Sequence, residues 1–128
     1  MPIMREVDVI PFRNRLKEYA TKIGMGLVNQ TKLITAASEL ARNMLRYANG
    51  GNATIEVLTK GRDSGLRVIF SDRGPGIVDL KQAMKDGFST GKSLGLGLPG
   101  AKRLVDEFDI VSEKGKGTTV TVTKWKHG

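Results

Sequence analysis

The strongest constraint on the fold is a run of apolar residues at helical spacing in the first half of the chain. Its apolar residues recur every three or four positions, which places them along one side of a helix. It comprises Leu33, Ile34, Ala37, Leu40, Ala41, Met44, Leu45 and Ala48. An Asn-Gly-Gly-Asn sequence at 49–52 ends it. Because a helix with one apolar side needs another layer to cover that side, the sequence predicts a long helix packed on a second layer.

Strands in the second half of the chain supply that layer. Four segments have the composition or alternation typical of strands: 53–59, 66–71, 110–112 and 118–125. The first two are joined by a Gly-containing turn at 61–65, which is typical of an antiparallel hairpin. We therefore expect neighbouring strands to pair mainly in the antiparallel sense.

The remaining segments predict three more helices and one more strand. Residues 7–10 predict a short strand that ends at Pro11, and residues 87–93 form a polar, Gly-containing stretch. Helices are expected at 12–25, 77–86 and 98–108. The resulting order predicts an α+β fold, a two-layer sandwich with helices over one face of a mixed, mainly antiparallel sheet.

Composition excludes several classes of protein. A chain of 128 residues is the size of one domain, which we expect to extend over 1–128. Without cysteine, a disulfide scaffold and a thiolate zinc site are both excluded. No stretch approaches the roughly 20 apolar residues of a membrane span, and the first residues lack the apolar core of a secretory signal. We therefore expect a cytoplasmic protein with no membrane contact.

The net charge of +8 is compatible with several partners. Nucleic acid, polyphosphate, an acidic protein or plain solvation of a basic surface would each suit it. The basic residues are spread from Arg5 to Lys126, and aromatic residues for base stacking are few. Nucleic acid is consequently an unlikely partner.

A carboxylate and two glycines follow the predicted strand at 66–71. Residues 72–76 read Asp-Arg-Gly-Pro-Gly, directly after an apolar triplet. A carboxylate at a strand end can accept hydrogen bonds from a flat ligand, and Gly74 and Gly76 would let backbone and ligand approach closely. The same residues are common in ordinary tight turns. This motif alone leaves both interpretations open.

The long helix carries a second candidate pair. Glu39 and Asn43 are four residues apart and share a helical face. They project nearly opposite the apolar stripe, so we expect both to point away from the core. The pair is compatible with a functional site and also with an ordinary solvated face.

A Gly-rich segment before the last predicted helix is a third candidate. Gly95, Gly97 and Gly100 have the spacing of a loop that opens a helix and presents free N–H groups to an anion such as phosphate. A plain flexible loop would look the same. A Rossmann site is unlikely because no strand precedes the segment. The Gly-Lys-Ser sequence at 91–93 is not a P-loop, because Asp86 occupies the position of its first glycine.

Together with Gly-Thr-Thr at 117–119, these motifs resemble, in order and spacing, the nucleotide site of the GHKL superfamily. This superfamily comprises the histidine-kinase-like ATPases of the Bergerat fold, and the resemblance covers essentially the whole chain. The short length and a single histidine, His127, point to the anti-sigma-factor type of serine/threonine kinase. Residues 38–43, 86–90 and 97–100 are most similar to the stressosome switch kinases.

The resemblance implies ATP and Mg²⁺ as cofactors and a role for individual residues. Glu39 would be the catalytic base and Asn43 the ligand of Mg²⁺. Asp72 would bind the adenine amino group with support from Thr119, and the loop at 88–94 would act as a lid. The nucleotide-binding residues would be Asn43, Asp72, Gly74, Gly76, Ser89, Thr90, Lys92, Gly95, Leu96, Gly97, Leu98 and Thr119.

The resemblance also implies a function in partner switching. Such a kinase would phosphorylate a STAS-domain antagonist or scaffold, and would activate a PP2C-type phosphatase or a similar output protein when released. An anti-sigma factor, or a nucleotide-binding docking module with little turnover, is the alternative. A module that only docks has no use for a base such as Glu39, which favours the kinase.

Overall fold

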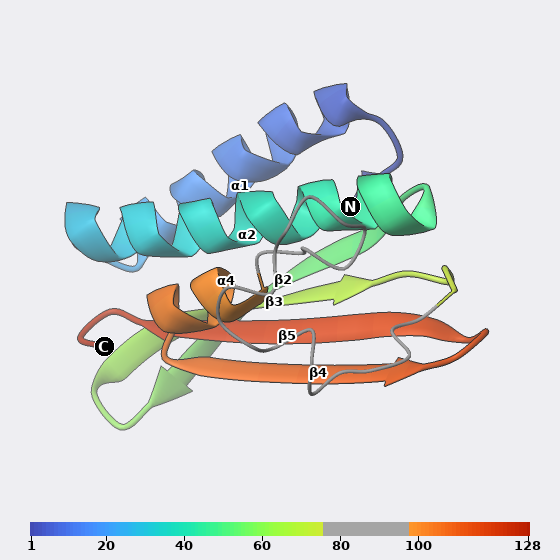
Figure 1. Ribbon diagram of the computed structural model, residues 1–128. Helices are drawn as coiled ribbons and strands as arrows, with labels where there is room; N and C mark the ends of the chain where they lie inside the picture. The colour runs from blue at the N-terminus through green and yellow to red at the C-terminus, as the bar shows by residue number, and fades with distance from the viewer. Residues whose placement is uncertain (76–97) are drawn as a thin grey trace.

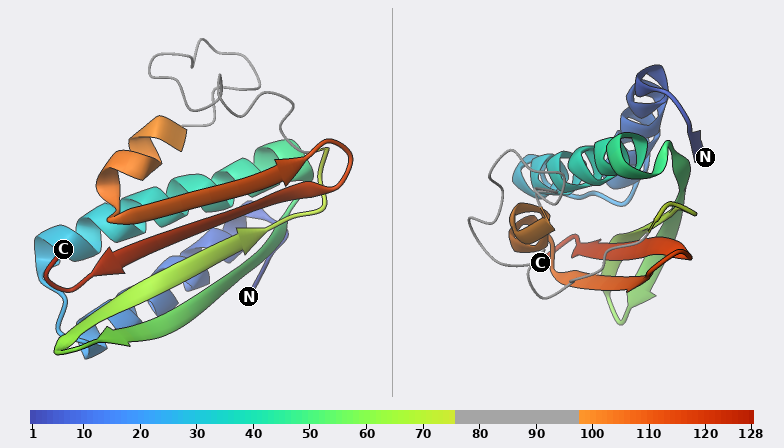
Figure 2. Two further views of the ribbon diagram at one scale, coloured as in Figure 1. Left: turned by 90° about the horizontal axis from the view of Figure 1, so that it is seen from below. Right: turned by 45° about the vertical axis from the view of Figure 1, so that its right-hand side comes forward.

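The computed structural model describes residues 1–75 and 98–128, and in these residues helices cover one face of a single sheet (Figures 1 and 2). The helices are α1 (Val9–Lys22), α2 (Leu27–Ala48) and α4 (Leu98–Leu104), and a 3₁₀ turn η1 (Glu6–Asp8) precedes α1. The strands are β1 (Pro2–Ile3), β2 (Gly51–Lys60), β3 (Asp63–Ser71), β4 (Glu107–Glu113) and β5 (Gly117–Trp125). The predicted two-layer sandwich is confirmed.

The sheet has the order β1-β2-β3-β5-β4. All strand pairs among the described residues are antiparallel, so this part of the sheet is not mixed. The hairpin of β2 and β3 was predicted, and β5 returns from the far end of the chain to pair with β3. As a result, the C-terminal end of β3 lies beside the N-terminal end of β5, where Ser71 faces Thr119.

Helix α2 forms where the apolar stripe predicts it. It ends at Ala48 because Asn49 turns into the left-handed conformation at φ 59° and the N–H of Gly50 donates to the carbonyl of Met44 at 2.9 Å. Its buried side includes several small residues, Ala36, Ala37 and Ala41, which let the helix lie close to its neighbours. Packing against the sheet therefore stabilises a helix that opens without a side-chain cap at Gly26.

The predicted strand at 7–10 is wrong, because this segment enters helix α1. The carboxylate of Asp8 accepts the N–H groups of Met4 at 2.9 Å and Arg5 at 3.0 Å, which closes a turn. Pro11 then falls in the first turn of α1, where its missing N–H breaks no helical hydrogen bond. The helix packs Phe12 edge-on against Phe70, with ring centroids 5.7 Å apart.

The predicted helix at 98–108 is also too long. Helix α4 ends at Leu104, and β4 begins at Glu107. The N–H of Asp106 donates to the carbonyl of Thr123 at 2.9 Å, so the chain has already joined the sheet at this point. Exposed and half-buried side chains then alternate along β4, which is the period of a strand with one covered face.

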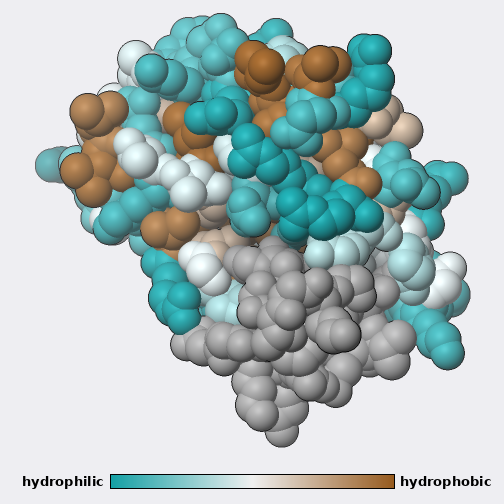
Figure 3. Space-filling model, turned by 45° about the horizontal axis from the view of Figure 1, so that its top comes forward, coloured by the Kyte–Doolittle hydropathy of each residue, from teal (hydrophilic) through white to brown (hydrophobic). Residues whose placement is uncertain are grey.

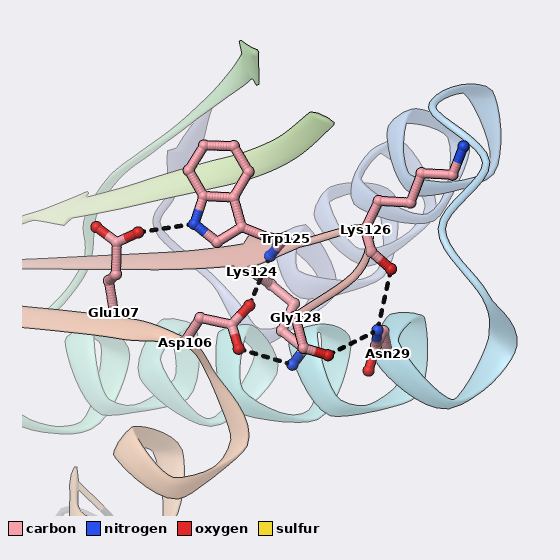
Figure 4. A network of polar contacts seen from close by, with 7 residues as sticks. All are labelled: Asn29, Asp106, Glu107, Lys124, Trp125, Lys126 and Gly128. Carbon is pink, nitrogen blue, oxygen red and sulfur yellow. Dashed lines mark hydrogen bonds and ion pairs between the residues drawn. The ribbon is translucent and has the colours of Figure 1, made fainter. Parts of the chain in front are cut away.

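A polar network closes the end of the sheet where β5 stops (Figure 4). Lys124 is buried and places Nζ 3.1 Å from Oδ1 of Asp106, while Oδ2 accepts the N–H of Trp125 at 2.7 Å. Asn29, near the start of α2, donates to the carbonyl of Lys126 at 3.2 Å. The network therefore ties α2, the connection between α4 and β4, and β5 together, at the end of the sheet away from the last residue of β3.

The outer face of the helical layer is mainly hydrophilic with scattered apolar side chains (Figure 3). Ile10 on α1 and Leu27 on α2 are among the large exposed apolar residues. No helix in residues 1–75 or 98–128 combines the length and the apolar character needed to cross a membrane.

Candidate functional site

A cavity lies between the C-terminal half of α2 and the end of the sheet where β3 stops and β5 begins. Four separate parts of the chain line it: α2, the end of β3 with the turn after it, the start of α4, and strands β4 and β5. The lining residues are Leu40, Asn43, Met44, Tyr47, Ala48, Phe70, Asp72, Pro75, Leu98, Ile110, Thr118 and Val120. An apolar cavity with a few polar groups is typical of a small-molecule site.

Among the described lining residues, Asp72 is the acidic one. It follows the last residue of β3, and its Oδ1 accepts the N–H of Gly74 at 2.9 Å and of Thr118 at 3.2 Å. Its own N–H donates to the carbonyl of Thr118 at 3.0 Å. Within the described residues both hydrogen bonds to the carboxylate end on Oδ1. Oδ2 is therefore the oxygen that can accept from a ligand.

Glycines let the turn that carries Asp72 pack closely against its neighbours. A Cβ on Gly74 would lie 2.5 Å from Cβ of Ala48, so Gly74 lets the turn lie directly on the end of α2. Gly117 has φ +97°, and a Cβ there would overlap the carbonyl oxygen of Asp72. The N–H of Gly115 also donates to the carbonyl of Pro75 at 2.8 Å. The turn is thus held between α2 and the β4–β5 turn, so the observed reason for Gly74 is packing against Ala48.

The pair Glu39 and Asn43 does not point away from the core as expected. Asn43 is only 8% exposed and lines the cavity. The reason is that α4 lies beside α2 and covers this side of the helix (Figure 1), an arrangement that the stripe alone does not predict. Glu39, one turn earlier, is half-buried and is not among the lining residues of the described chain.

The structure corrects the prediction for Thr119. Side chains alternate across a strand, and Thr118 and Val120 line the cavity while Thr119 lies between them on the other face of the sheet. Thr118 is the residue that bonds to Asp72. The sequence carried a signal for this orientation. Thr118 alternates in step with the core residues Val120 and Val122, so its side chain lies on the same face of the sheet as theirs.

The predicted phosphate-binding residues are only partly placed. Leu98 is 2% exposed, begins α4 and lines the cavity. Gly76, Ser89, Thr90, Lys92, Gly95, Leu96 and Gly97 lie outside the described residues, as do the predicted helix at 77–86 and the lid at 88–94. The structure therefore brings together Asn43, Asp72 and Leu98 from the predicted set, with Gly74 directly behind Asp72.

The described residues offer little for a metal apart from Asn43. They contain no group of three or more His, Cys, Asp or Glu side chains that could hold an ion. Mg²⁺ commonly takes one or two protein oxygens and completes its shell with water and substrate phosphates. The carboxamide of Asn43, in the cavity wall, fits this kind of site and does not fit a metal cage made by protein alone.

Comparison with known proteins agrees with this geometry. Residues 28–127 match the family described as histidine kinase-, DNA gyrase B-, and HSP90-like ATPase. The chain belongs to this family. The match begins in α2 and runs through β5, so it includes every part of the chain that lines the cavity. The predicted superfamily is therefore confirmed.

Relatives narrow the assignment within the family. The chain is 46% identical over 123 residues to the serine/threonine-protein kinase RsbT of Bacillus subtilis (strain 168), which covers 96% of this chain and 92% of that protein. It is 30% identical over 119 residues to the anti-sigma F factor of Thermoanaerobacter sp. (strain X514), with 88% and 82% covered. The likeness to the first relative confirms the prediction of a protein serine/threonine kinase that uses ATP.

Proposed function

We propose that the cavity beside Asp72 is the adenine end of an ATP site and that the kinase works as a switch between protein partners. The observation that supports this best is the state of Asp72, which stands in an apolar cavity with Oδ1 held by two backbone N–H groups. The amino group of adenine would donate to Oδ2, and the ring would lie among the apolar side chains. Thr118 takes the supporting role that was predicted for Thr119.

Asn43 is the proposed ligand for Mg²⁺. Its carboxamide lies in the same wall as Asp72, on the side formed by α2. Magnesium, when bound, would offset the negative charge of the phosphates. For the phosphates themselves we propose Ser89, Thr90, Lys92, Gly95, Leu96, Gly97 and Leu98, and for the backbone beside the base Gly74 and Gly76.

Glu39 is the proposed catalytic base. It lies one helical turn before Asn43 on α2 and is half-buried, which suits a group that meets a substrate at the edge of the site. In the proposed reaction a Ser or Thr hydroxyl of the partner protein attacks the γ-phosphorus, and the bond from that phosphorus to the β-phosphate oxygen breaks. The hydroxyl proton passes to Glu39, and ADP leaves.

The proposed substrate is a STAS-domain antagonist or scaffold protein in the cytoplasm, and the proposed output is a PP2C-type phosphatase. One relative is named as a protein kinase and others as anti-sigma F factors, which supports a role in regulation through protein partners. The anti-sigma F factors among these relatives support a second candidate, an anti-sigma factor or docking module with little turnover.

Phosphoryl transfer from γ-labelled ATP to purified STAS-domain proteins tests the proposal. Glu39→Ala should keep the Kd for ATP and lose roughly 10²–10⁴-fold in transfer rate, the usual effect of removing a positioned base. Glu18→Ala is the matched control, because Glu18 lies exposed on α1 beside Arg15. Wild-type transfer by the Glu39 variant would disprove the role of the base. Nucleotide binding without transfer by the wild-type protein would favour the docking module.

A further inference from the structure

A second hydroxyl group lies beside Thr118, on the same face of the sheet. Oγ of Ser112 is 2.7 Å from Oγ1 of Thr118, and the two residues face each other on β4 and β5. This is the usual length of a strong O–H···O hydrogen bond. Both residues are partly buried, and Thr118 alone lines the cavity. Among the described residues that line the cavity, Thr118 is therefore the one through which we connect Ser112 to the candidate site.

The hydrogen bonds around this pair restrict what the Thr118 hydroxyl can offer to the cavity. A hydroxyl group has one hydrogen to donate and two lone pairs to accept with. Oγ of Ser112 can donate to the carbonyl of Gly117, 3.3 Å away. When it does so, the hydrogen of Thr118 points to Ser112, and the Thr118 oxygen has lone pairs left for the cavity.

The cavity wall would then carry two acceptors, Oδ2 of Asp72 and Oγ1 of Thr118. The backbone N–H of Thr118 already holds Oδ1 of Asp72 at 3.2 Å, so the Thr118 side chain starts from a residue bonded to the carboxylate. A purine with an amino group at this position suits two acceptors. A purine with a carbonyl oxygen there would bring a third acceptor against them and leave it without a donor.

We propose that Ser112 is a positioning residue that fixes the Thr118 hydroxyl as an acceptor and thereby helps the site prefer adenine over hypoxanthine. The inference rests on the proposed function, because it needs the base of the nucleotide in this cavity. In this proposal Ser112 acts through Thr118, the one of the two that is among the described lining residues.

Calorimetric titration with ATP and with ITP, which carries a carbonyl in place of the adenine amino group, tests this role. Ser112→Ala should lower the ratio of the Kd for ITP to the Kd for ATP by about tenfold, mainly because ATP binds more weakly. This is the effect of one lost hydrogen bond. Ser112→Thr keeps a hydroxyl and should restore the preference. Thr121→Ala is the matched control, because Thr121 lies on β5 opposite Asp109 and away from the cavity.

The outcomes separate this inference from the proposed function. A wild-type protein that binds ATP well, together with a Ser112→Ala variant of unchanged ATP-to-ITP ratio, overturns the role of Ser112 alone. An equal loss for both nucleotides, with no change in their ratio, overturns it as well, because that result describes a general structural defect. A wild-type protein that binds neither nucleotide overturns the proposed function and this inference together.

Discussion

Replacing Gly117 with alanine should damage the candidate site through the backbone that holds Asp72. Gly117 begins β5 with φ +97°, and a Cβ there would overlap the carbonyl oxygen of Asp72 and lie 2.9 Å from Cα of Arg73. Neither contact involves a flexible side-chain end that could move aside. The turn at 72–75 must therefore shift away from β5, and the carboxylate of Asp72 must shift with it.

The turn between β4 and β5 offers a matched control. Gly115 has φ +79°, and a Cβ there would meet nothing within 4 Å. Gly115→Ala should therefore cost only the strain of a left-handed residue, about 1–2 kcal/mol. Gly117→Ala should cost that strain and about 1–3 kcal/mol more for the steric overlap. The difference between the two variants in the free energy of unfolding isolates the overlap.

Urea unfolding and ATP titration measure the two effects. We expect Gly117→Ala to be the less stable variant and to bind ATP more weakly than wild type, while Gly115→Ala keeps the wild-type Kd. If both variants unfold at the same urea concentration and bind ATP like the wild-type protein, the turn is not seated against the start of β5, and the reasoning fails.

Three further changes test other parts of the account. Lys124→Met should lower the free energy of unfolding by about 3 kcal/mol, because it leaves Asp106 without its partner in a mostly buried ion pair. Adding Asp106→Asn should recover part of this loss. Strictly additive losses of the two substitutions in urea unfolding would contradict the pairing. Gly26→Ser should raise the unfolding free energy by a few tenths of a kcal/mol, because Gly26 caps α2 with no side-chain hydrogen bond and has open space around it. Hydrogen bonds from two backbone N–H groups hold the pKa of Asp8 below its ordinary value of 3.8. Its carboxylate therefore stabilises the fold above pH 3.8, and this contribution disappears as the pH falls through the pKa of the folded state. Asp8→Asn should accordingly be less stable than wild type at neutral pH and equal to it in strong acid; an equal difference in stability at both pH values would contradict the charge argument.

The features predicted well are those that depend on periodicity over many residues. Helix α2 and the hairpin of β2 and β3 follow from apolar spacing and a Gly-rich turn. The position of Asp72 at a strand end follows from the apolar triplet before it. The convergence of these elements on one cavity came from the family resemblance, because spacing along the chain does not specify which strands become neighbours.

The features predicted wrongly depend on contacts between distant residues. The segment at 7–10 has strand-like alternation, yet a single carboxylate, Asp8, turns it into the start of a helix. Asn43 looks solvent-facing until α4 is placed beside α2. The choice between Thr118 and Thr119 depends on which side chains of β5 face the helices, because a shift of one residue moves a side chain to the other face of a sheet.

Titration of ATP with Mg²⁺ into wild-type protein and the Asp72→Asn variant tests the central claim most directly. Asparagine can keep a carbonyl oxygen at the Oδ1 position for the N–H groups of Gly74 and Thr118, while its NH₂ group replaces the acceptor at Oδ2. We predict unchanged folding and an ATP affinity at least about tenfold weaker, the effect of one hydrogen bond to a charged group. Asp109→Asn, on β4 opposite Thr121, should bind like wild type. An equal Kd for wild type and Asp72→Asn would contradict the account.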